Sequence, residues 1–290
     1  MSYTGAVSSG QSLRLLVSAD AAGLRLDQAI ALLSPSVSRA AARRLIDQGS
    51  VFLAGSRTKV ASRVVKAGQR IDVHLPPSSV ARERDVPTPD IPILLLTDDL
   101  VVVDKPSGLL SAPTPQTDRA DLLYFLQKQL GQLYLVHRLD AHTSGALVLA
   151  RTAASARDLS AQLENRTLGR TYLALLAGEI AADFSADSPI GERPACTHFR
   201  VIERGRGATK VEAELETGRT HQIRIHAQAA GHPVLGDRKY GGSGVTELGR
   251  APRLALHATS VRFALPGAGR TETVHAPFPP ELEAYWSALR

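Results

Sequence analysis

The chain has 290 residues, long enough for two ordinary domains, and its hydrophobic content of 43% allows a sizeable buried core. No stretch reaches the roughly 18 to 20 apolar residues that a membrane helix needs, and the single cysteine, Cys196, excludes an internal disulfide and a multi-cysteine zinc site. The net charge is +6, and residues 1–80 carry all of it, with ten basic and four acidic residues against 24 of each sign in the rest. This asymmetry indicates a module for a polyanion such as nucleic acid, although a basic surface that only aids solubility fits the charge equally well.

Residues 1–12 are small and polar, so they predict a loose tail rather than a secretion signal. Two helices follow, the first with one apolar face and the second with a capping serine and a terminating glycine. Their residues are Leu26, Ala29, Ile30 and Leu33, and then Ser38, Ala41, Ala42, Leu45, Ile46 and Gly49. Strands are predicted from Val51 and over RIDVHL, with a turn at Gly55.

Basic side chains gather on the second helix and in the turn and strand after it. The strings RLDQAIA, SRAAARRLIDQGSVFLAG and VKAGQRIDV resemble, over residues 25–75, the RNA-binding domain named after small-subunit ribosomal protein S-four. The resemblance implies a small α/β domain over residues 13–76 that holds RNA phosphates without reading their sequence. Its candidate RNA-binding residues are Arg39, Arg43, Arg44, Arg57 and Lys59.

The proline-rich stretch PPSSVARERDVPTPDIP predicts a semi-extended linker over residues 77–92. Beyond it, apolar β-rich runs alternate irregularly with helical patterns. Strands are predicted at 93–96, 100–104, 146–151, 171–178, 198–204, 210–216 and, as one long or two short strands, 254–265; helices are predicted near 119–130, 153–165, 221–230 and 280–289. This order predicts an α+β fold with a mixed, largely antiparallel β-sheet over residues 93–290.

Three polar clusters interrupt these apolar runs. In VHRLDAHTSGALVLA, Asp140 fits either a reactive carboxylate or an ordinary Asp/Ser turn. In TGRTHQIRIHAQ, Thr220 can cap a helix that presents Arg224, either to a carboxylate of another loop or in a surface ion pair. In GRTYLALLAGE, Tyr172 lies early in an apolar strand, where core packing also explains a tyrosine.

Together with DKPSGLLSAP, GHPVLGDRKYGG and LALHA, these strings resemble in order and spacing the motifs of the RluA-type pseudouridine synthases, over residues 93–280. The resemblance implies that Asp140 is the catalytic aspartate, that Arg224 pairs with it and that Tyr172 stacks on the target base. It also implies that Arg138 enters the RNA helix beside the flipped nucleotide and that Leu256 lies beneath the pocket.

The chain departs from the family pattern in two places. Arg151 stands where lysine is frequent, and the segment between Pro113 and His137, a region that varies with substrate, is short. These departures do not change the chemistry that the resemblance implies, but they leave the target nucleotide undetermined.

The implied reaction breaks the bond between ribose and a uracil nitrogen, turns the base and joins the ribose to a ring carbon. Nothing is oxidised and no group leaves, so neither a cofactor nor a metal is expected. The base must first be flipped out of its stack, at a cost of a few kcal/mol. Asp140 then acts either as nucleophile on the sugar or as base at its 2′ carbon, and a bidentate pair with Arg224 is predicted to orient it.

Three other functions fit part of the sequence. His137, His221, His226, His232 and His257, with Asp237, suggest a metal hydrolase, but His221 and His226 are five residues apart and would diverge by about 140° on a helix. A catalytically inactive RNA-binding ribosome-assembly factor would keep the basic first domain, yet has no need of Asp140, Tyr172 and Arg224. A glycoside hydrolase would need a second acid beside Asp140, which the motifs lack.

The expected partner is RNA. Large-subunit ribosomal RNA is favoured, because a joined RNA-binding domain is typical of synthases acting there, and transfer RNA is the alternative. We expect a monomer in the cytoplasm, with no membrane partner.

Overall fold

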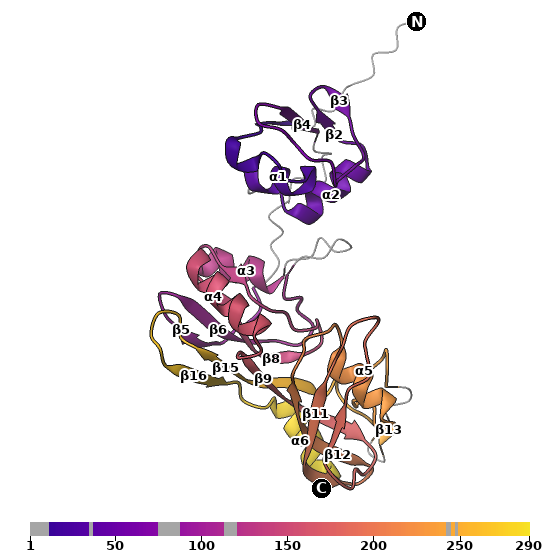
Figure 1. The fold of residues 1–290 in the computed structure, drawn as a ribbon. Coiled ribbons are helices and arrows are strands. Elements are labelled where there is room, and N and C mark those ends of the chain that lie inside the picture. Colours follow the sequence, from indigo (N-terminus) through magenta and orange to yellow (C-terminus); the bar gives the residue numbers. More distant parts are fainter. Residues whose placement is uncertain (1–11, 35–36, 75–87, 113–120, 242–244, 247–248) are drawn as a thin grey trace, which may run out of the picture. The chain divides into compact units, whose positions relative to one another are not determined.

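The computed structural model describes residues 12–34, 37–74, 88–112, 121–241, 245–246 and 249–290. The chain divides into two compact units, whose described parts end at residue 74 and begin at residue 88 (Figure 1). Apart from Ser12, the predicted tail lies outside the described residues, as does the predicted linker apart from residues 88–92. None of the described helices is long and apolar enough to cross a bilayer.

The N-terminal unit packs two helices on a four-stranded antiparallel sheet of order β1-β4-β2-β3. Its elements are β1 (Ser12–Leu16), the 3-10 turn η1 (Ala19–Ala21), α1 (Leu26–Leu33), α2 (Arg39–Asp47), β2 (Val51–Leu53), β3 (Ser56–Arg57) and β4 (Arg70–His74). Ser38 caps α2 by accepting a hydrogen bond from the amide of Ala41 at 3.1 Å, as predicted. Both helices and the strands β2 and β4 confirm the prediction, whereas β1 and β3 were not predicted.

The larger unit is built on a ten-stranded sheet of order β10-β11-β12-β9-β15-β8-β6-β5, with β16 paired to β15 and β7 to β8. Its strands are β5 (Ile93–Leu96), β6 (Leu100–Lys105), β7 (Tyr134–Leu135), β8 (Ser144–Ala150), β9 (Gly169–Ala177), β10 (Phe184–Ala186), β11 (Thr197–Gly205), β12 (Ala208–Leu215), β15 (Leu256–Ala264) and β16 (Thr271–His275), beside a separate pair, β13 (Val245–Thr246) and β14 (Gly249–Arg250). Among the described strands of this sheet, only β8 and β15 pair in parallel. The predicted fold, α+β with a mixed and largely antiparallel sheet, is confirmed.

Helices cover both faces of this sheet. They are α3 (Leu122–Leu130), α4 (Ala153–Glu164), α5 (Gln222–Ala229) and α6 (Pro280–Leu289), close to the four predicted ranges. Successive residues of β6 alternate between two cores: Val101 and Val103 join the core of α3, α5 and α6, while Leu100 and Val102 join the core of α4. Burial on both faces explains why this strand is a continuous apolar run in the sequence.

Candidate active site

Asp140 lies in the loop between β7 and β8, and the segment from Lys105 to Ser111 holds that loop on both sides of it. The fully buried Lys105 donates from Nζ to the carbonyl oxygens of Pro106, Leu109 and Ala141 at 2.8 to 3.0 Å. Burial lowers the pKa of Lys105 to about 7. The hydroxyl of Ser111 accepts from the amide of Leu139 at 3.1 Å and donates to its carbonyl at 2.8 Å. The DKPSGLLS string therefore fixes the backbone immediately before and after Asp140.

Gly145 joins this loop to the centre of the sheet. It pairs in parallel with Ala258, and a Cβ atom at residue 145 would lie 2.2 Å from the carbonyl oxygen of Ala258. Its φ of 113° is also one that side-chain-bearing residues rarely adopt. Only glycine allows this contact, which brings the start of β15, and with it Leu256, beside the loop that carries Asp140.

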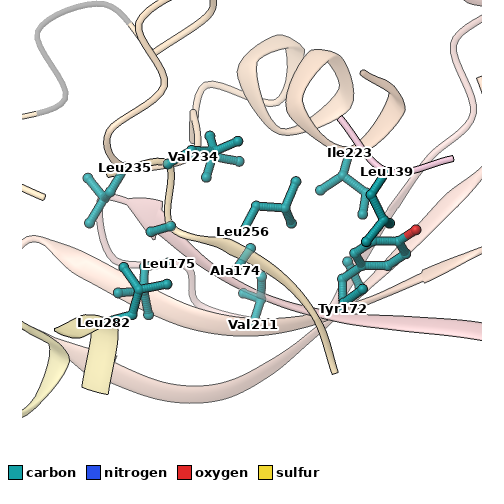
Figure 2. Packing of buried hydrophobic residues seen from close by; sticks show 14 of the residues in the cluster. Leu139, Tyr172, Ala174, Leu175, Val211, Ile223, Val234, Leu235, Leu256 and Leu282 are labelled. Carbon is teal, nitrogen blue, oxygen red and sulfur yellow. The ribbon is translucent and has the colours of Figure 1, made fainter. Parts of the chain in front are cut away.

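Tyr172 and Leu256 form the apolar floor of the site. Tyr172 on β9 pairs with Ala258 on β15. Tyr172 is 5% exposed and Leu256 is 3% exposed. Leu139 and Ile223 lie beside Tyr172 (Figure 2). Burial raises the pKa of Tyr172, so the phenol stays neutral at neutral pH. This floor offers a flat aromatic surface to a planar ligand.

Arg224, from the first turn of α5, contacts two carboxylates. Its Nη1 donates to Oδ2 of Asp140 at 3.3 Å, while Nε and Nη2 donate to Asp237 at 2.6 and 2.8 Å. The structure therefore brings Arg224 to Asp140, but the predicted bidentate pair is made with Asp237 instead. Asp237 also accepts from the amides of Lys239 and Tyr240; although burial acts to raise its pKa, Arg224 and these amides lower it below the ordinary value. Asp237 is thus fully satisfied, whereas Asp140 receives a single, longer bond from this arginine.

His221 lies near Oδ1 of Asp140, the carboxylate oxygen that Arg224 does not contact. Its Nε2 lies 3.8 Å from Oδ1 of Asp140, and its Nδ1 lies 3.0 Å from the hydroxyl of Tyr240. Burial lowers the pKa of His221, which favours the neutral ring. His221 is the residue that precedes α5, with a left-handed φ of 59°, so the expectation that Thr220 caps this helix was wrong. The left-handed turn is what directs the histidine to the site.

An open cavity of about 450 Å³ unites the site. The five residues predicted for the catalytic unit all line it: Arg138, Asp140, Tyr172, Arg224 and Leu256. Thr143, Arg170, Gly218, Arg219 and His221 are also in the lining. Arg138 is exposed at the cavity. The cavity thus combines a carboxylate, an aromatic floor and several arginines.

The predicted RNA-binding residues belong to the N-terminal unit. The carboxylate of Asp27, fully buried, faces three arginines: Nε of Arg25 at 3.3 Å, of Arg39 at 3.0 Å and of Arg43 at 3.5 Å. Burial acts to raise the pKa of Asp27, but Arg39 and Arg25 lower it below its ordinary value. A second hollow includes Arg25, Arg43, Arg44 and Lys59 in its lining, and Arg57 donates from Nε to the carbonyl of Gly49.

The histidines considered for a metal site have separate partners. His226 bonds Thr197 and Ser188, His257 bonds Ser144, and His232 bonds the carbonyl of Ala177. Within the described part of the chain, one group of three side chains has metal-ligand spacing: Cys196, His198 and Glu216. Its His198 and Glu216 already hydrogen-bond each other at 2.8 Å, and none of the three lines the cavity around Asp140.

Sequence reasoning missed Asp237, His221, Lys105 and Ser111 as parts of this site. All four lie inside the strings that carried the family resemblance, so a signal was present. The strings did not show which side chains would bond to each other. Arg224 and Asp237 meet only because the chain folds back after α5.

Known proteins similar to the chain identify its family. A family described as RNA pseudouridylate synthase matches residues 99–229, and the S4 domain matches residues 24–71. The ribosomal large subunit pseudouridine synthase D of Nitrosomonas europaea is 35% identical, covering 100% of this chain and 91% of the relative, and that of Xanthomonas campestris is 35% identical, covering 96% and 93%. Among solved structures, the human RNA pseudouridylate synthase domain containing 1 is 29% identical with a TM-score of 0.56, covering 67% of this chain and 87% of the human one.

Proposed function

The chain belongs to the RNA pseudouridylate synthase family, and from that premise we propose that it isomerises uridines of large-subunit ribosomal RNA to pseudouridine. The relatives from Nitrosomonas europaea and Xanthomonas campestris, which it matches over more than nine-tenths of their length, carry large-subunit names, which supports this RNA over transfer RNA. The observation that carries the proposal is the cavity in which Asp140, Tyr172, Arg224 and Leu256 meet. We further propose that the protein is a cytoplasmic monomer. It needs no metal or cofactor in this proposal, because the isomerisation oxidises nothing and transfers no group to a second molecule.

The two units divide the work in this proposal. Residues 13–76 hold RNA phosphates through the arginines around Asp27 and the neighbouring Lys59, and residues 93–290 perform the chemistry. Arg138, exposed at the cavity, takes the space left by the flipped uridine, since a guanidinium both stacks on bases and bonds phosphate. The flipped uracil lies on Tyr172, with Leu256 beneath it.

Asp140 is the reacting group. As a carboxylate it either attacks the sugar carbon that bears the base or removes a proton from the 2′ carbon; in both routes the bond to the base nitrogen breaks and uracil takes the electron pair. The base turns on Tyr172 and its ring carbon bonds to the sugar, while Asp140 either leaves the sugar carbon with its electron pair or returns the proton to the 2′ carbon. The proton on the ring carbon is then lost. Arg224 donates to Oδ2 of Asp140 and His221 lies 3.8 Å from Oδ1, so the hydrogen bond from the arginine orients the carboxylate before the RNA binds.

A pseudouridine map of ribosomal and transfer RNA from cells lacking the gene tests this function. The cells are then given the wild type, Asp140→Asn or Asp98→Asn, the last a matched control in an exposed turn between β5 and β6. We expect a large-subunit site to be lost on deletion and restored by the wild type and Asp98→Asn, but not by Asp140→Asn. Restoration by Asp140→Asn would support the inactive assembly factor, and a change confined to transfer RNA would move the substrate there.

A further inference from the structure

Arg170 lines the cavity, and no described residue is paired with its charge. It precedes Tyr172 by two residues on β9, so both side chains leave the same face of the strand, about 7 Å apart along it. Its Nε is buried without a hydrogen-bond partner, and among the described residues no carboxylate forms an ion pair with it. A half-buried arginine in this condition loses hydration without compensation, unless a ligand supplies the acceptor.

Gly218 accommodates this arginine. A Cβ atom at residue 218 would lie 2.7 Å from Nη1 of Arg170, and 3.4 to 3.5 Å from Nη2 and Cζ. Unlike Gly145, Gly218 does not have a positive φ, so its backbone conformation does not require glycine. Gly218, from the TGRTHQIR string, therefore leaves room for the guanidinium of Arg170, from the GRTY string. The two strings together form this part of the cavity wall.

The charge around the cavity identifies the class of ligand. Arg138, Arg170 and Arg219 all line it, while the one carboxylate that lines it, Asp140, already contacts Arg224. An excess of positive charge at a partly desolvated surface favours an anion. With the flipped uracil on Tyr172, the group about 7 Å further along the strand is the sugar-phosphate rather than the ring.

We infer, on the basis of the proposed action on RNA uridines, that Arg170 binds the phosphate beside the flipped nucleotide and that Gly218 keeps space for this contact. Arg170 is then a substrate-positioning residue. Its loss weakens the RNA complex and leaves the isomerisation of a bound uridine largely unchanged.

Full-length wild type, Arg170→Ala, Arg170→Lys, Gly218→Ala and the double variant Arg170→Ala/Gly218→Ala test this. Arg200→Ala is the control, because Arg200 is an exposed arginine on β11 that pairs with Glu212 and does not line the cavity. Large-subunit ribosomal RNA transcribed without pseudouridine serves both for Kd over a range of salt and for kcat and KM. Loss of a charge-assisted bond to phosphate predicts a Kd and KM about tenfold higher for Arg170→Ala. The slope of log Kd against log salt should fall by about 0.7 to 0.9.

Gly218→Ala should reproduce these changes, because its methyl group displaces the guanidinium, and it should add nothing in the double variant. Arg170→Lys should keep the salt slope while recovering part of the affinity, since lysine retains the charge but not the planar fork. A fall in kcat with unchanged Kd would overturn the inference in favour of a contact to the detached base. An altered melting temperature with unchanged Kd and slope would show a purely structural role. If the wild type binds this RNA but does not isomerise it, the proposed function fails while the Kd and slope still decide the role of Arg170.

Discussion

Both units contain a network of arginines and carboxylates, but arginines outnumber carboxylates in one network and carboxylates outnumber arginines in the other. In the N-terminal unit one buried carboxylate, Asp27, faces three arginines. In the catalytic unit one buried arginine, Arg224, faces two carboxylates. The first network therefore has an excess of positive charge and the second an excess of negative charge. In each, the excess charge is on the more exposed side chains, which are Arg39 and Arg43 in the first network and Asp140 in the second.

In the proposed function, the same pair of residue types serves RNA binding in one unit and chemistry in the other. Around Asp27 the surplus guanidinium groups are about half exposed and can bind phosphates. Around Arg224, Asp237 takes the two short bonds, and Asp140 is left with one at 3.3 Å and with open space above it. In each network a buried ion, Asp27 or Arg224, holds its partners in place. In the proposed function, the partners that make fewer hydrogen bonds within the network are the ones that contact the RNA.

The largest expected effect comes from removing the shared cation with Arg224→Met. Asp237 would then be a buried charge without a counter-charge, held only by the amides of Lys239 and Tyr240. Breaking such a buried ion pair costs about 3 to 5 kcal/mol of unfolding free energy. Loss of the preorganised charge beside Asp140 should lower kcat by about a hundredfold to a thousandfold. Urea unfolding and pseudouridine formation on ribosomal RNA measure the two effects.

The double variant Arg224→Met/Asp237→Leu separates them. An apolar pair in place of the buried ions should restore most of the stability, because no uncompensated charge remains. The activity should stay low, since Asp140 still lacks its partner. Recovery of kcat in the double variant would contradict the role assigned to Arg224.

Acid should affect the two units differently. Burial lowers the pKa of His137 to about 3 and that of His257 to about 4, both in the catalytic unit, from an ordinary value of 6.5. As pH falls from 6.5 towards 4, the unfolded chain takes up protons that the folded unit excludes, so each histidine lowers the stability by about 1.4 kcal/mol per pH unit. Asp121, whose pKa burial raises to about 6, acts in the opposite direction below pH 6 and offsets about one of these two effects. In the described N-terminal unit the one histidine, His74, is exposed, and Asp27, with its lowered pKa, loses its contribution only below an ordinary value of 3.8.

Fluorescence of Trp286 reports on the catalytic unit alone, because it is the only tryptophan and is fully buried in α6. Amide exchange in α1 and α2 reports on the other unit. Between pH 7 and 4.5 the first signal should show falling stability and the second should not. His137→Leu should flatten the pH slope by about 1.4 kcal/mol per unit, and an equal acid response of the two units would contradict this.

The smallest effect concerns the basic network, where Arg39→Ala/Arg43→Ala should raise the Kd for ribosomal RNA by about tenfold and reduce the salt slope by about two phosphate contacts. The kcat at saturating RNA should stay unchanged, because neither residue lines the cavity around Asp140. Filter binding over a salt series measures the first effect, and an unchanged slope would rule out phosphate contacts at these arginines.

Asp27→Asn is the matched control for that pair. It keeps every arginine but removes the buried negative charge of Asp27 and one of its two acceptor oxygens, so the N-terminal unit should lose about 1 to 3 kcal/mol of unfolding free energy. Its RNA affinity should fall less than that of the double variant. A larger fall would mean that the geometry imposed by Asp27, rather than the charge, dominates binding.

Much of the fold was predictable because local signals agreed with the tertiary structure. The four helices of the catalytic unit and the two of the N-terminal unit follow apolar periodicity and caps, such as Ser38 before α2. The strands β7, β10 and β16 escaped prediction because they are short or lie at the edge of the sheet with mixed polar sequences. Their pairing depends on neighbouring strands that local pattern does not contain.

The members of the candidate site were predictable, but their partners were not. Asp140, Tyr172, Arg224, Arg138 and Leu256 share one cavity, as the family motifs implied. The preference of Arg224 for Asp237, and the left-handed turn that brings His221 to Asp140, depend on how α5 and the following loop pack together. Such choices are made between residues far from each other in sequence, so spacing alone could not decide them.

The parallel pairing at Gly145 also determines when the site can exist. It joins Ser144 to His257, 113 residues later, and between them lie β9, β11, β12 and α5. Contacts of such separation form slowly, because the entropy of closing the long loop between them must be paid first. During synthesis, Asp140 and its loop therefore leave the ribosome long before Leu256 can pack beside Tyr172. A nascent chain that ends before β15 carries Asp140, Tyr172 and Arg224 but not the complete cavity, so we expect it to be inactive until β15 has been made and paired.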